Sequence, residues 1–259
     1  MKFTDKIAIV TGAASGLGAA LATQLVEQGA QVIIADIAQQ KAQEVAARLG
    51  SRAHAVPVDV SMPEQIEAVV SLAKSKFGSL DLFFNNAGTL AYGEASAIPF
   101  SEWDRIVRVN LLGVIAGSLC AYRVMKEQRS GRIINISSGS VLSCDPLFAP
   151  YVTSKFGVFG FSRLLAMEAE VDNIIVSVVC PGNIRTPMLN QNEPSWLTPA
   201  IPAENAARYI LRGVTRNEKI IVFPLRWRLF WWADRLSPAL LNPLRRIIIR
   251  RARQRKLSS

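Results

Sequence analysis

A tyrosine and a lysine, Tyr151 and Lys155, stand four positions apart in the run Tyr-Val-Thr-Ser-Lys. On a helix this spacing brings the phenol and the ammonium to one face. A phenol, with a pKa of about 10, is a poor base at neutral pH, but a cation held a few ångströms away stabilises the phenolate and lowers that pKa. The pair therefore predicts a tyrosine that exchanges a proton with a bound substrate.

A serine, Ser138, lies 13 residues before this tyrosine, at the end of an apolar run typical of a buried strand. Tyr-x-x-x-Lys occurs often by chance, and its simpler interpretation is a surface pair. A serine hydroxyl in the same cleft changes that balance, because a hydroxyl and a phenol together can hold an oxygen on which negative charge develops. The three residues predict chemistry at the oxygen of an alcohol or a ketone.

The segment from Thr11 to Gly18 is rich in glycine and reads Thr-Gly-x-x-x-Gly-x-Gly. Glycines allow the backbone to turn tightly and approach a pyrophosphate, and the free N–H groups where a helix begins supply donors to it. An acid, Asp36, ends the next predicted strand. A carboxylate there accepts hydrogen bonds from the adenosine ribose hydroxyls and repels a 2′-phosphate, so we expect NAD rather than NADP. The other interpretation of Asp36 is a solvated acid at a strand end.

The chain has three widely spaced cysteines and a single histidine, His54. His54 lies in a strand-like run, where a partly buried structural histidine is the preferred interpretation. No Cys-x-x-Cys pair occurs in the sequence. Hydrolysis that depends on imidazole, a disulfide framework and a His/Cys metal site are therefore poorly supported, and we expect no metal.

Short apolar runs alternate with helical patterns along the chain, which is typical of a parallel sheet covered on both faces. We therefore expect an α/β fold, a doubly wound (Rossmann) seven-stranded parallel sheet with helices on both faces and ligands at the carboxyl ends of its strands. The strands are predicted at Lys6–Thr11, Gln31–Asp36, Ala53–Val58, Asp81–Asn85, Arg132–Ser137, Ile174–Cys180 and Lys219–Phe223. The predicted helices include Ala38–Leu49, Pro63–Phe77, Phe100–Gln128 and Tyr151–Val171.

In the order and spacing of these motifs, the sequence resembles the short-chain dehydrogenase/reductase family over about residues 5 to 223. No catalytic position departs from the family pattern. Further matches are Asp59-Val60 after the third strand, Asn85-Asn86-Ala87-Gly88 after the fourth, Asn110 in the long helix, and Pro181-Gly182 followed by Ile184 and Thr186.

The resemblance implies a catalytic set of Asn110, Ser138, Tyr151 and Lys155. Ser138 would hydrogen-bond the substrate oxygen and Tyr151 would exchange the proton. Lys155 would bind the nicotinamide ribose and lower the pKa of the tyrosine, while Asn110 would anchor a water through which protons reach solvent. Hydride transfer creates negative charge on the substrate oxygen, which is where the hydroxyl and the phenol would stabilise it.

The resemblance also implies how NAD is held. Asp59 and Val60 would contact adenine, and Ile184 and Thr186 would hold the carboxamide. The full set of expected cofactor contacts is Gly12, Ser15, Gly16, Leu17, Gly18, Asp36, Asp59, Val60, Asn86, Ala87, Gly88, Tyr151, Lys155, Pro181, Gly182, Ile184 and Thr186.

The segment Pro187–Leu197 has no clear periodicity, and in the family this region forms a movable lid over the substrate. We expect a hydrophobic alcohol or ketone, such as a steroid or a lipid, unless the apolar residues here are ordinary packing. Two alternatives stay open: an NADPH-dependent lipid ketone reductase, and a dinucleotide-binding membrane scaffold without turnover. Arg185 is the one basic residue expected at the substrate, and the predicted apolar wall consists of Leu142, Leu147, Phe148, Met188, Leu189 and Trp196.

Positive charge is concentrated at the carboxyl end. Residues 220–259 hold ten Lys and Arg against one acid, so this segment carries +9 of the formal net charge of +10. We predict a dehydrogenase domain at 1–224 and a basic, aromatic-rich extension at 225–259. Its apolar runs are too short to span a bilayer, but alternating Trp and Arg suit a membrane surface. Packing against the body or a second subunit is the alternative, and nucleic acid is disfavoured.

Family members usually pair through two long helices, so we expect a homodimer or a homotetramer joined by Phe100–Gln128 and Tyr151–Val171. The start of the chain shows no secretory signal. We therefore expect a cytoplasmic protein, peripheral on the inner membrane face if the extension binds lipid.

Overall fold

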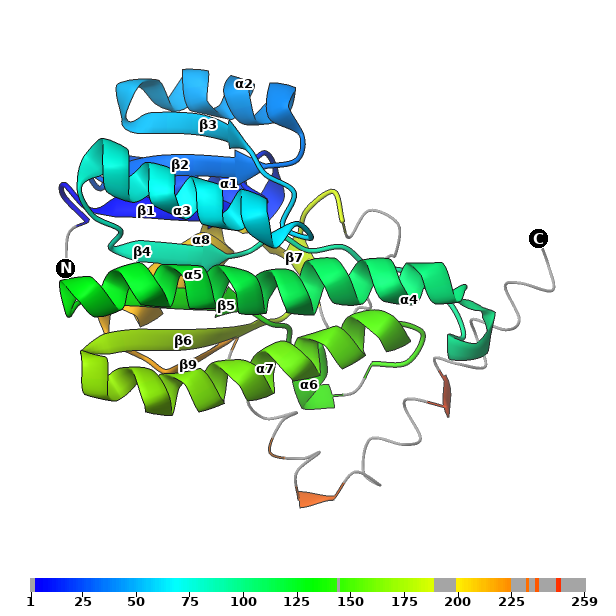
Figure 1. The fold of residues 1–259 in the computed structure, drawn as a ribbon. Coiled ribbons are helices and arrows are strands. Elements are labelled where there is room, and N and C mark those ends of the chain that lie inside the picture. Colours follow the sequence, from blue (N-terminus) through cyan, green and yellow to red (C-terminus); the bar gives the residue numbers. More distant parts are fainter. Residues whose placement is uncertain are drawn as a thin grey trace.

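A computed structural model describes residues 3–143, 145–188, 199–224, 232, 236–237 and 246–247. Within these residues seven parallel strands form one sheet in the order β3-β2-β1-β4-β5-β6-β9 (Figure 1). The predicted doubly wound sheet is therefore confirmed. The strands are β1 Ile7–Thr11, β2 Gln31–Asp36, β3 Ala53–Pro57, β4 Leu82–Asn85, β5 Gly131–Ile136, β6 Ile174–Pro181 and β9 Ile220–Phe223.

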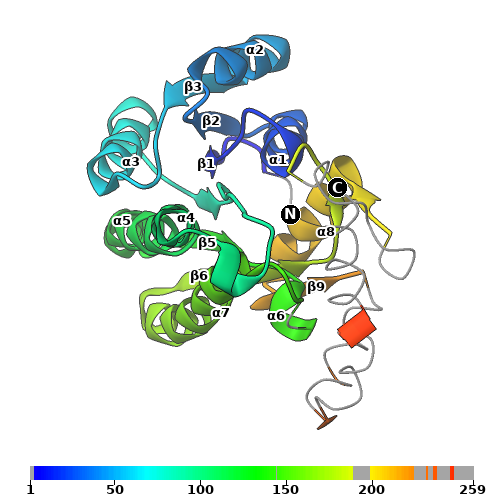
Figure 2. The same cartoon turned by 90° about the vertical axis from the view of Figure 1, so that its right-hand side faces the viewer.

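Helices cover both faces of the sheet, so the central strands are buried on both sides (Figure 2). This burial explains why β1 is a continuous apolar run rather than an alternating one. The helices on one face, whose apolar side chains share a core with the sheet, are α1 Gly16–Glu27, α2 Gln39–Leu49 and α8 Ala203–Thr215. The helices on the other face are α3 Pro63–Phe77, α5 Gly113–Gln128 and α7 Ala149–Ala169.

The long helix predicted over Phe100–Gln128 differs from a regular α-helix in its middle. It begins as α4 (Phe100–Val107), continues as a π-helical segment, η3 (Arg108–Leu112), and ends as α5. A π segment inserts an extra residue into the helix and is frequent at functional sites. The whole helix is long and apolar enough to cross a membrane, but it packs between α3 and α7, as a core helix of this fold does.

Two features in the carboxyl-terminal part of the chain were not predicted from the sequence. Helix α8 precedes β9, and its buried apolar residues recur at helical spacing, a signal that could have found it. A separate pair of two-residue strands, β7 (Ile184–Arg185) and β8 (Ile201–Pro202), brackets the predicted lid. Short helical turns occur at Gly50–Arg52 (η1), Ala95–Ala97 (η2), Ser140–Ser143 (α6) and Glu170–Asp172 (η4).

Two predicted segments fall mainly outside the described residues. Of the extension at 225–259 only 232, 236–237 and 246–247 are described, and of the lid only Pro187 and Met188. Leu189 and Trp196 of the expected apolar wall lie outside as well. The division into 1–224 and 225–259 stays a prediction.

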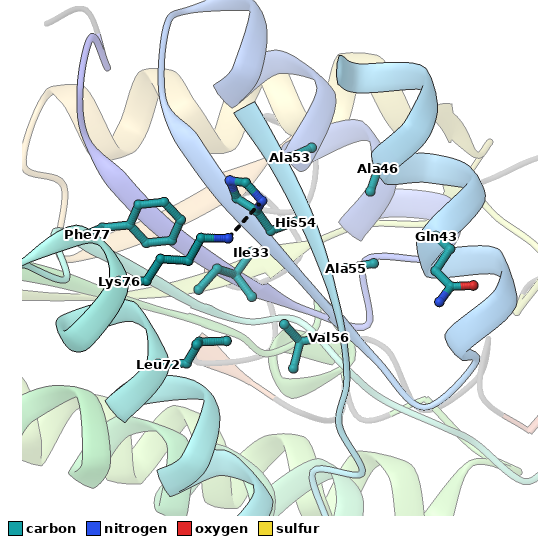
Figure 3. Close-up of a pocket in the computed structure, with 10 residues that line it drawn as sticks. All are labelled: Ile33, Gln43, Ala46, Ala53, His54, Ala55, Val56, Leu72, Lys76 and Phe77. Carbon is teal, nitrogen blue, oxygen red and sulfur yellow. Dashed lines mark hydrogen bonds between the residues drawn. The ribbon is translucent and has the colours of Figure 1, made fainter. Parts of the chain in front are cut away.

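The single histidine lies on β3 at the edge of the sheet, in an open cleft of about 430 Å³ between α2 and α3 (Figure 3). Its Nδ1 is 3.3 Å from Nζ of Lys76, and its ring lies 5.2 Å from that of Phe77, centroid to centroid. Burial, and then the charge of Lys76, lower the pKa of His54. His54 is thus a partly buried residue packed on α3, and the residues that line this cleft are different from those expected at the active site.

Candidate active site

A cavity of about 680 Å³ opens at the carboxyl ends of the central strands. Every residue expected to contact the cofactor lines it, from the glycine turn after β1 to Thr186, and Ser138 lines it too. The parallel topology produces this gathering, because β1, β2, β4, β5 and β6 all end at the same edge of the sheet.

The glycine turn is locked to the end of β4. The side-chain amide of Asn86 donates to the carbonyl oxygens of Thr11 and Gly12, at 2.9 and 3.1 Å. A Cβ on Gly18 would lie 2.2 Å from the Gly12 oxygen and 2.6 Å from Nδ2 of Asn86, so only glycine fits there. Helix α1 begins at Gly16 without a side-chain cap, which leaves N–H groups at the cavity for an anion. The turn therefore fits a pyrophosphate.

The carboxylate of Asp36 lies at one end of the cavity and is oriented by two main-chain groups. Its Oδ2 accepts a hydrogen bond from the N–H of Ala14 and its Oδ1 from the N–H of Ala38, both at 2.9 Å. Asp36 thereby ties the glycine turn to the end of β2. Ile37, which follows it, also lines the cavity and brings no positive charge to this end. A carboxylate held in this way can accept hydrogen bonds from the hydroxyl groups of a bound ribose.

Ser138, Tyr151 and Lys155 are brought together where the end of β5 meets the first turns of α7. The Ser138 and Tyr151 side chains are hydrogen-bonded to each other, and Oγ of Ser138 also accepts from the N–H of Ser140 at 3.1 Å. Nζ of Lys155 donates to the carbonyl oxygen of Ile136 at 2.8 Å and lies 5.7 Å from the centre of the Tyr151 ring. The three side chains that the sequence singled out thus share one wall of the cavity.

The pKa of the phenol moves opposite to the sequence-based expectation. Burial raises the pKa of Tyr151, the hydrogen bond with Ser138 works against that rise, and the charge of Asp145 adds to it. Burial also lowers the pKa of Lys155 to about 8. The expected lowering by Lys155 is not met because its ammonium is directed at Ile136 and desolvation dominates. In this arrangement the phenol keeps its proton and can donate it.

Asn110 does not line the cavity but lies directly behind it. Within the π segment η3 its Oδ1 accepts from the N–H of Thr89 at 2.8 Å, and its Nδ2 donates to the Thr89 carbonyl at 2.7 Å and to Oγ of Ser154 at 3.3 Å. A Cβ on Gly88 would lie 3.4 Å from Oδ1 of Asn110 and 3.7 Å from Nζ of Lys155. Asn110 and Lys155 therefore close around Gly88, and the role of Asn110 in anchoring a water stays a prediction.

The wall of the cavity is more polar than the sequence suggested. Phe148 and Met188 line it as expected, whereas Leu142 and Leu147 are buried and are not among the lining residues. Residues that line the cavity and were not predicted from the sequence include Thr89, Leu90, Arg105, Arg108 and Asp145.

The two arginines, Arg105 and Arg108, reach the cavity from the same helix. Arg105 donates to Oγ1 of Thr89 at 2.7 Å and pairs with Glu102, and Arg108 pairs with Asp104. Their spacing of three residues, shortly before Asn110, is a signal that could have placed both on the cavity side of the helix.

Comparisons with known proteins agree with this geometry. Residues 6–196 match the family model described as short chain dehydrogenase. The chain is 39% identical over 187 residues to a 3-alpha-(or 20-beta)-hydroxysteroid dehydrogenase of Mycobacterium tuberculosis, covering 72% of each chain. It is 35% identical over 206 residues to a 3-oxoacyl-(acyl-carrier-protein) reductase of Salmonella typhimurium, covering 78% of this chain and 84% of that one.

Solved structures give the same picture. A short-chain type dehydrogenase/reductase from Mycobacterium marinum superposes with a TM-score of 0.80 at 27% identity, covering 86% of this chain and 95% of that one. A 3-ketoacyl-(acyl-carrier-protein) reductase from Brucella melitensis, complexed with NADH, also gives 0.80 at 28% identity, covering 85% and 96%.

Proposed function

The chain belongs to the short-chain dehydrogenase/reductase family and is an oxidoreductase acting on CH–OH groups, and on that premise we propose that it moves a hydride between NAD(H) and a hydrophobic secondary alcohol or its ketone. The observation that carries the proposal is the hydrogen-bonded pair Ser138 and Tyr151 on the wall of the cavity that also holds the glycine turn and Asp36.

The chain's own residues would handle the substrate oxygen. When bound, the nicotinamide ring supplies the carbon that gives or accepts the hydride. The hydroxyl of Ser138 and the phenol of Tyr151 would hold the carbonyl oxygen of a ketone, and Tyr151 would donate its proton as that oxygen becomes an alkoxide. In the oxidising direction the phenolate would take the proton of the alcohol. Lys155 would place its ammonium at the ribose and keep the phenolate stable.

NAD is the proposed cofactor because the carboxylate of Asp36, oriented by the N–H groups of Ala14 and Ala38, would accept hydrogen bonds from the ribose hydroxyls and repel a 2′-phosphate. The family uses either nicotinamide cofactor, so an NADPH-dependent ketone reductase is the rival. Measuring the Kd of NADH and of NADPH by quenching of tryptophan fluorescence separates the two. We expect NADH to bind at least about tenfold more tightly, since each hydrogen bond to the carboxylate would contribute about 1.5–3 kcal/mol. Tighter binding of NADPH would reverse the proposal.

The proposed substrate is hydrophobic. The apolar residues Leu90, Phe148 and Met188 are among those that line the cavity, and one relative is described as a hydroxysteroid dehydrogenase. A panel of secondary alcohols and ketones of rising chain length, followed by NADH absorbance, tests this point. We expect kcat/KM to rise with apolar size, whereas a preference for small polar substrates would contradict it. A non-catalytic scaffold would turn over none of them.

A homodimer or homotetramer is proposed from the outer surfaces of α5 and α7. These two helices carry the exposed apolar side chains Leu119, Phe156, Leu164 and Met167, although the fold buries most large apolar residues. We expect Leu164→Glu to shift the sedimentation coefficient towards that of the monomer. Leu72→Glu, at an exposed apolar position on α3, is the matched control and should leave the assembly intact.

Contact of residues 225–259 with a membrane is proposed from their composition, since aromatic and arginine residues alternate there. The protein would then be cytoplasmic and peripheral on the inner membrane face. We expect the full chain to float with vesicles that contain anionic lipid, and a variant ending at residue 224 to stay behind. If the shortened variant floats equally well, the extension is not the membrane contact.

A further inference from the structure

The helix that carries Tyr151 and Lys155 must keep a fixed position along its axis relative to the strand that leads to Ser138. Helix α7 faces the sheet with Val158, Leu165 and other apolar or small side chains. Apolar packing is not directional, so it resists separation better than sliding. Hydrogen bonds depend on angle and distance, so they can fix the position of the helix along its axis.

A buried polar cluster supplies such bonds. Oδ1 of Asn135, on β5, accepts from Nδ2 of Asn85 at 2.8 Å and from Oγ of Ser118 at 3.1 Å. Nδ2 of Asn135 donates to Oγ of Ser162, on α7, at 2.9 Å. All four side chains are buried. Asn135 therefore joins β4, α5 and α7 at the centre of the molecule, where a satisfied polar network is rigid.

Ser162 lies on the same helix face as Lys155, seven residues further along, which is about 10 Å of helix. Its hydroxyl donates to the carbonyl oxygen of Val158 at 2.6 Å while accepting from Asn135. Nearer the active site, Oγ of Ser137 donates to the carbonyl oxygen of Lys155 at 2.9 Å. Helix α7 is thus joined to β5 and the residue that follows it by three hydrogen bonds, one at Ser162 and two at Lys155, and any slide of the helix along its axis would displace both reacting side chains together.

We propose that Ser162 is a positioning residue for the reaction. Its hydrogen bond from Asn135 fixes the position of α7 along its axis relative to β5, and with it the placement of Tyr151 and Lys155 opposite Ser138. Ser162 touches neither substrate nor cofactor, and it acts through the helix. Because a misplacement of about 1 Å can cost about 100-fold in rate, loss of the attachment at Ser162 should slow the chemical step measurably.

The test compares two buried Ser→Ala variants. Ser162→Ala removes the bond from Asn135, and Ser177→Ala, on β6, removes a bond to the carbonyl of Glu218 away from α7. Both should lower the Tm by a few degrees. We expect Ser162→Ala to lower kcat about tenfold while the KM for ketone and the Kd of NADH stay within about twofold, and Ser177→Ala to keep the kcat of the native protein.

A third variant, Ser162→Thr, retains the hydroxyl and should restore most of the lost kcat. The proposal is overturned if Ser162→Ala keeps its kcat, if Ser177→Ala loses as much kcat for the same fall in Tm, or if Ser162→Thr is as slow as Ser162→Ala. The first result would mean that α7 needs no polar attachment there, and the other two that only stability or packing is involved.

Discussion

The ammonium of Lys155 bonds to the main-chain oxygen of Ile136, 2.8 Å away, while its Nζ lies 5.7 Å from the centre of the Tyr151 ring. The spacing of four residues brings the two side chains together, but the end of β5 decides what the ammonium contacts. Tyr151 is consequently a buried phenol whose pKa is raised and whose hydrogen-bond partner is Ser138. Such a group is suited to donating a proton to a ketone.

Replacing Tyr151 by phenylalanine should abolish turnover and keep cofactor binding. The ring still fills its site, but the proton donor is gone, and general acid catalysis is worth about 100-fold or more. NADH absorbance measures the rate and fluorescence the binding. Tyr122→Phe is the matched control, because its phenol bonds to Asp172 and it does not line the cavity. Substantial activity in Tyr151→Phe would show that another group moves the proton.

The two directions of the reaction should depend on pH in opposite ways. Because the pKa of Tyr151 is raised, its phenol stays protonated through neutral pH, and alcohol oxidation, which needs the phenolate, should speed up as the pH rises. Ketone reduction needs the protonated phenol and should slow as that proton is lost, whereas the ammonium of Lys155, whose pKa is lowered to about 8, would serve both directions alike. Profiles of kcat in both directions provide the measurement. Parallel profiles would contradict this assignment of the two groups.

Removing the carboxylate of Asp36 should weaken NADH binding about tenfold or more. The Kd values of NADH and NADPH should therefore become more similar. The carboxylate also holds the N–H groups of Ala14 and Ala38, so urea unfolding must be measured alongside. Asp5→Ala, which removes an exposed acid at the start of the chain, is the control. Equal losses of affinity for both cofactors would indicate that Asp36 acts on the glycine turn alone.

Two glycine-to-alanine changes should have opposite effects on the free energy of unfolding. In Gly18→Ala the new methyl group would lie 2.2 Å from the Gly12 oxygen, so we expect a loss of about 1–3 kcal/mol in the free energy of unfolding and weaker cofactor binding. In Gly160→Ala, within α7, no atom of the described residues outside the helix's own backbone would lie within 4 Å of the new methyl group, and we expect a gain of about 0.5–1 kcal/mol in the free energy of unfolding. Urea titration measures both. A neutral Gly18→Ala would mean that the turn adjusts easily.

The sequence predicts the sheet well because its strands are buried on both faces and stand out as apolar runs. It also places the candidate residues well, since glycines and polar groups that end parallel strands must meet at one edge. It does not reveal the π segment around Asn110, whose signal is only a buried amide in a helical pattern. It also misleads about the pKa of Tyr151, because the bond from Lys155 to a main-chain carbonyl has no counterpart in side-chain spacing.

The strand order has a consequence for synthesis of the protein. Strand β4 pairs with β1 on one side and with β5 on the other, yet β5 lies some 45 residues further along the chain. A nascent chain that has emerged only as far as α4 therefore presents the bare edge of β4, with the apolar residues Leu82, Phe83 and Phe84, to its surroundings. We expect the growing polypeptide to be most prone to aggregate, and most in need of a chaperone, in the interval before Gly131–Ile136 leaves the ribosome.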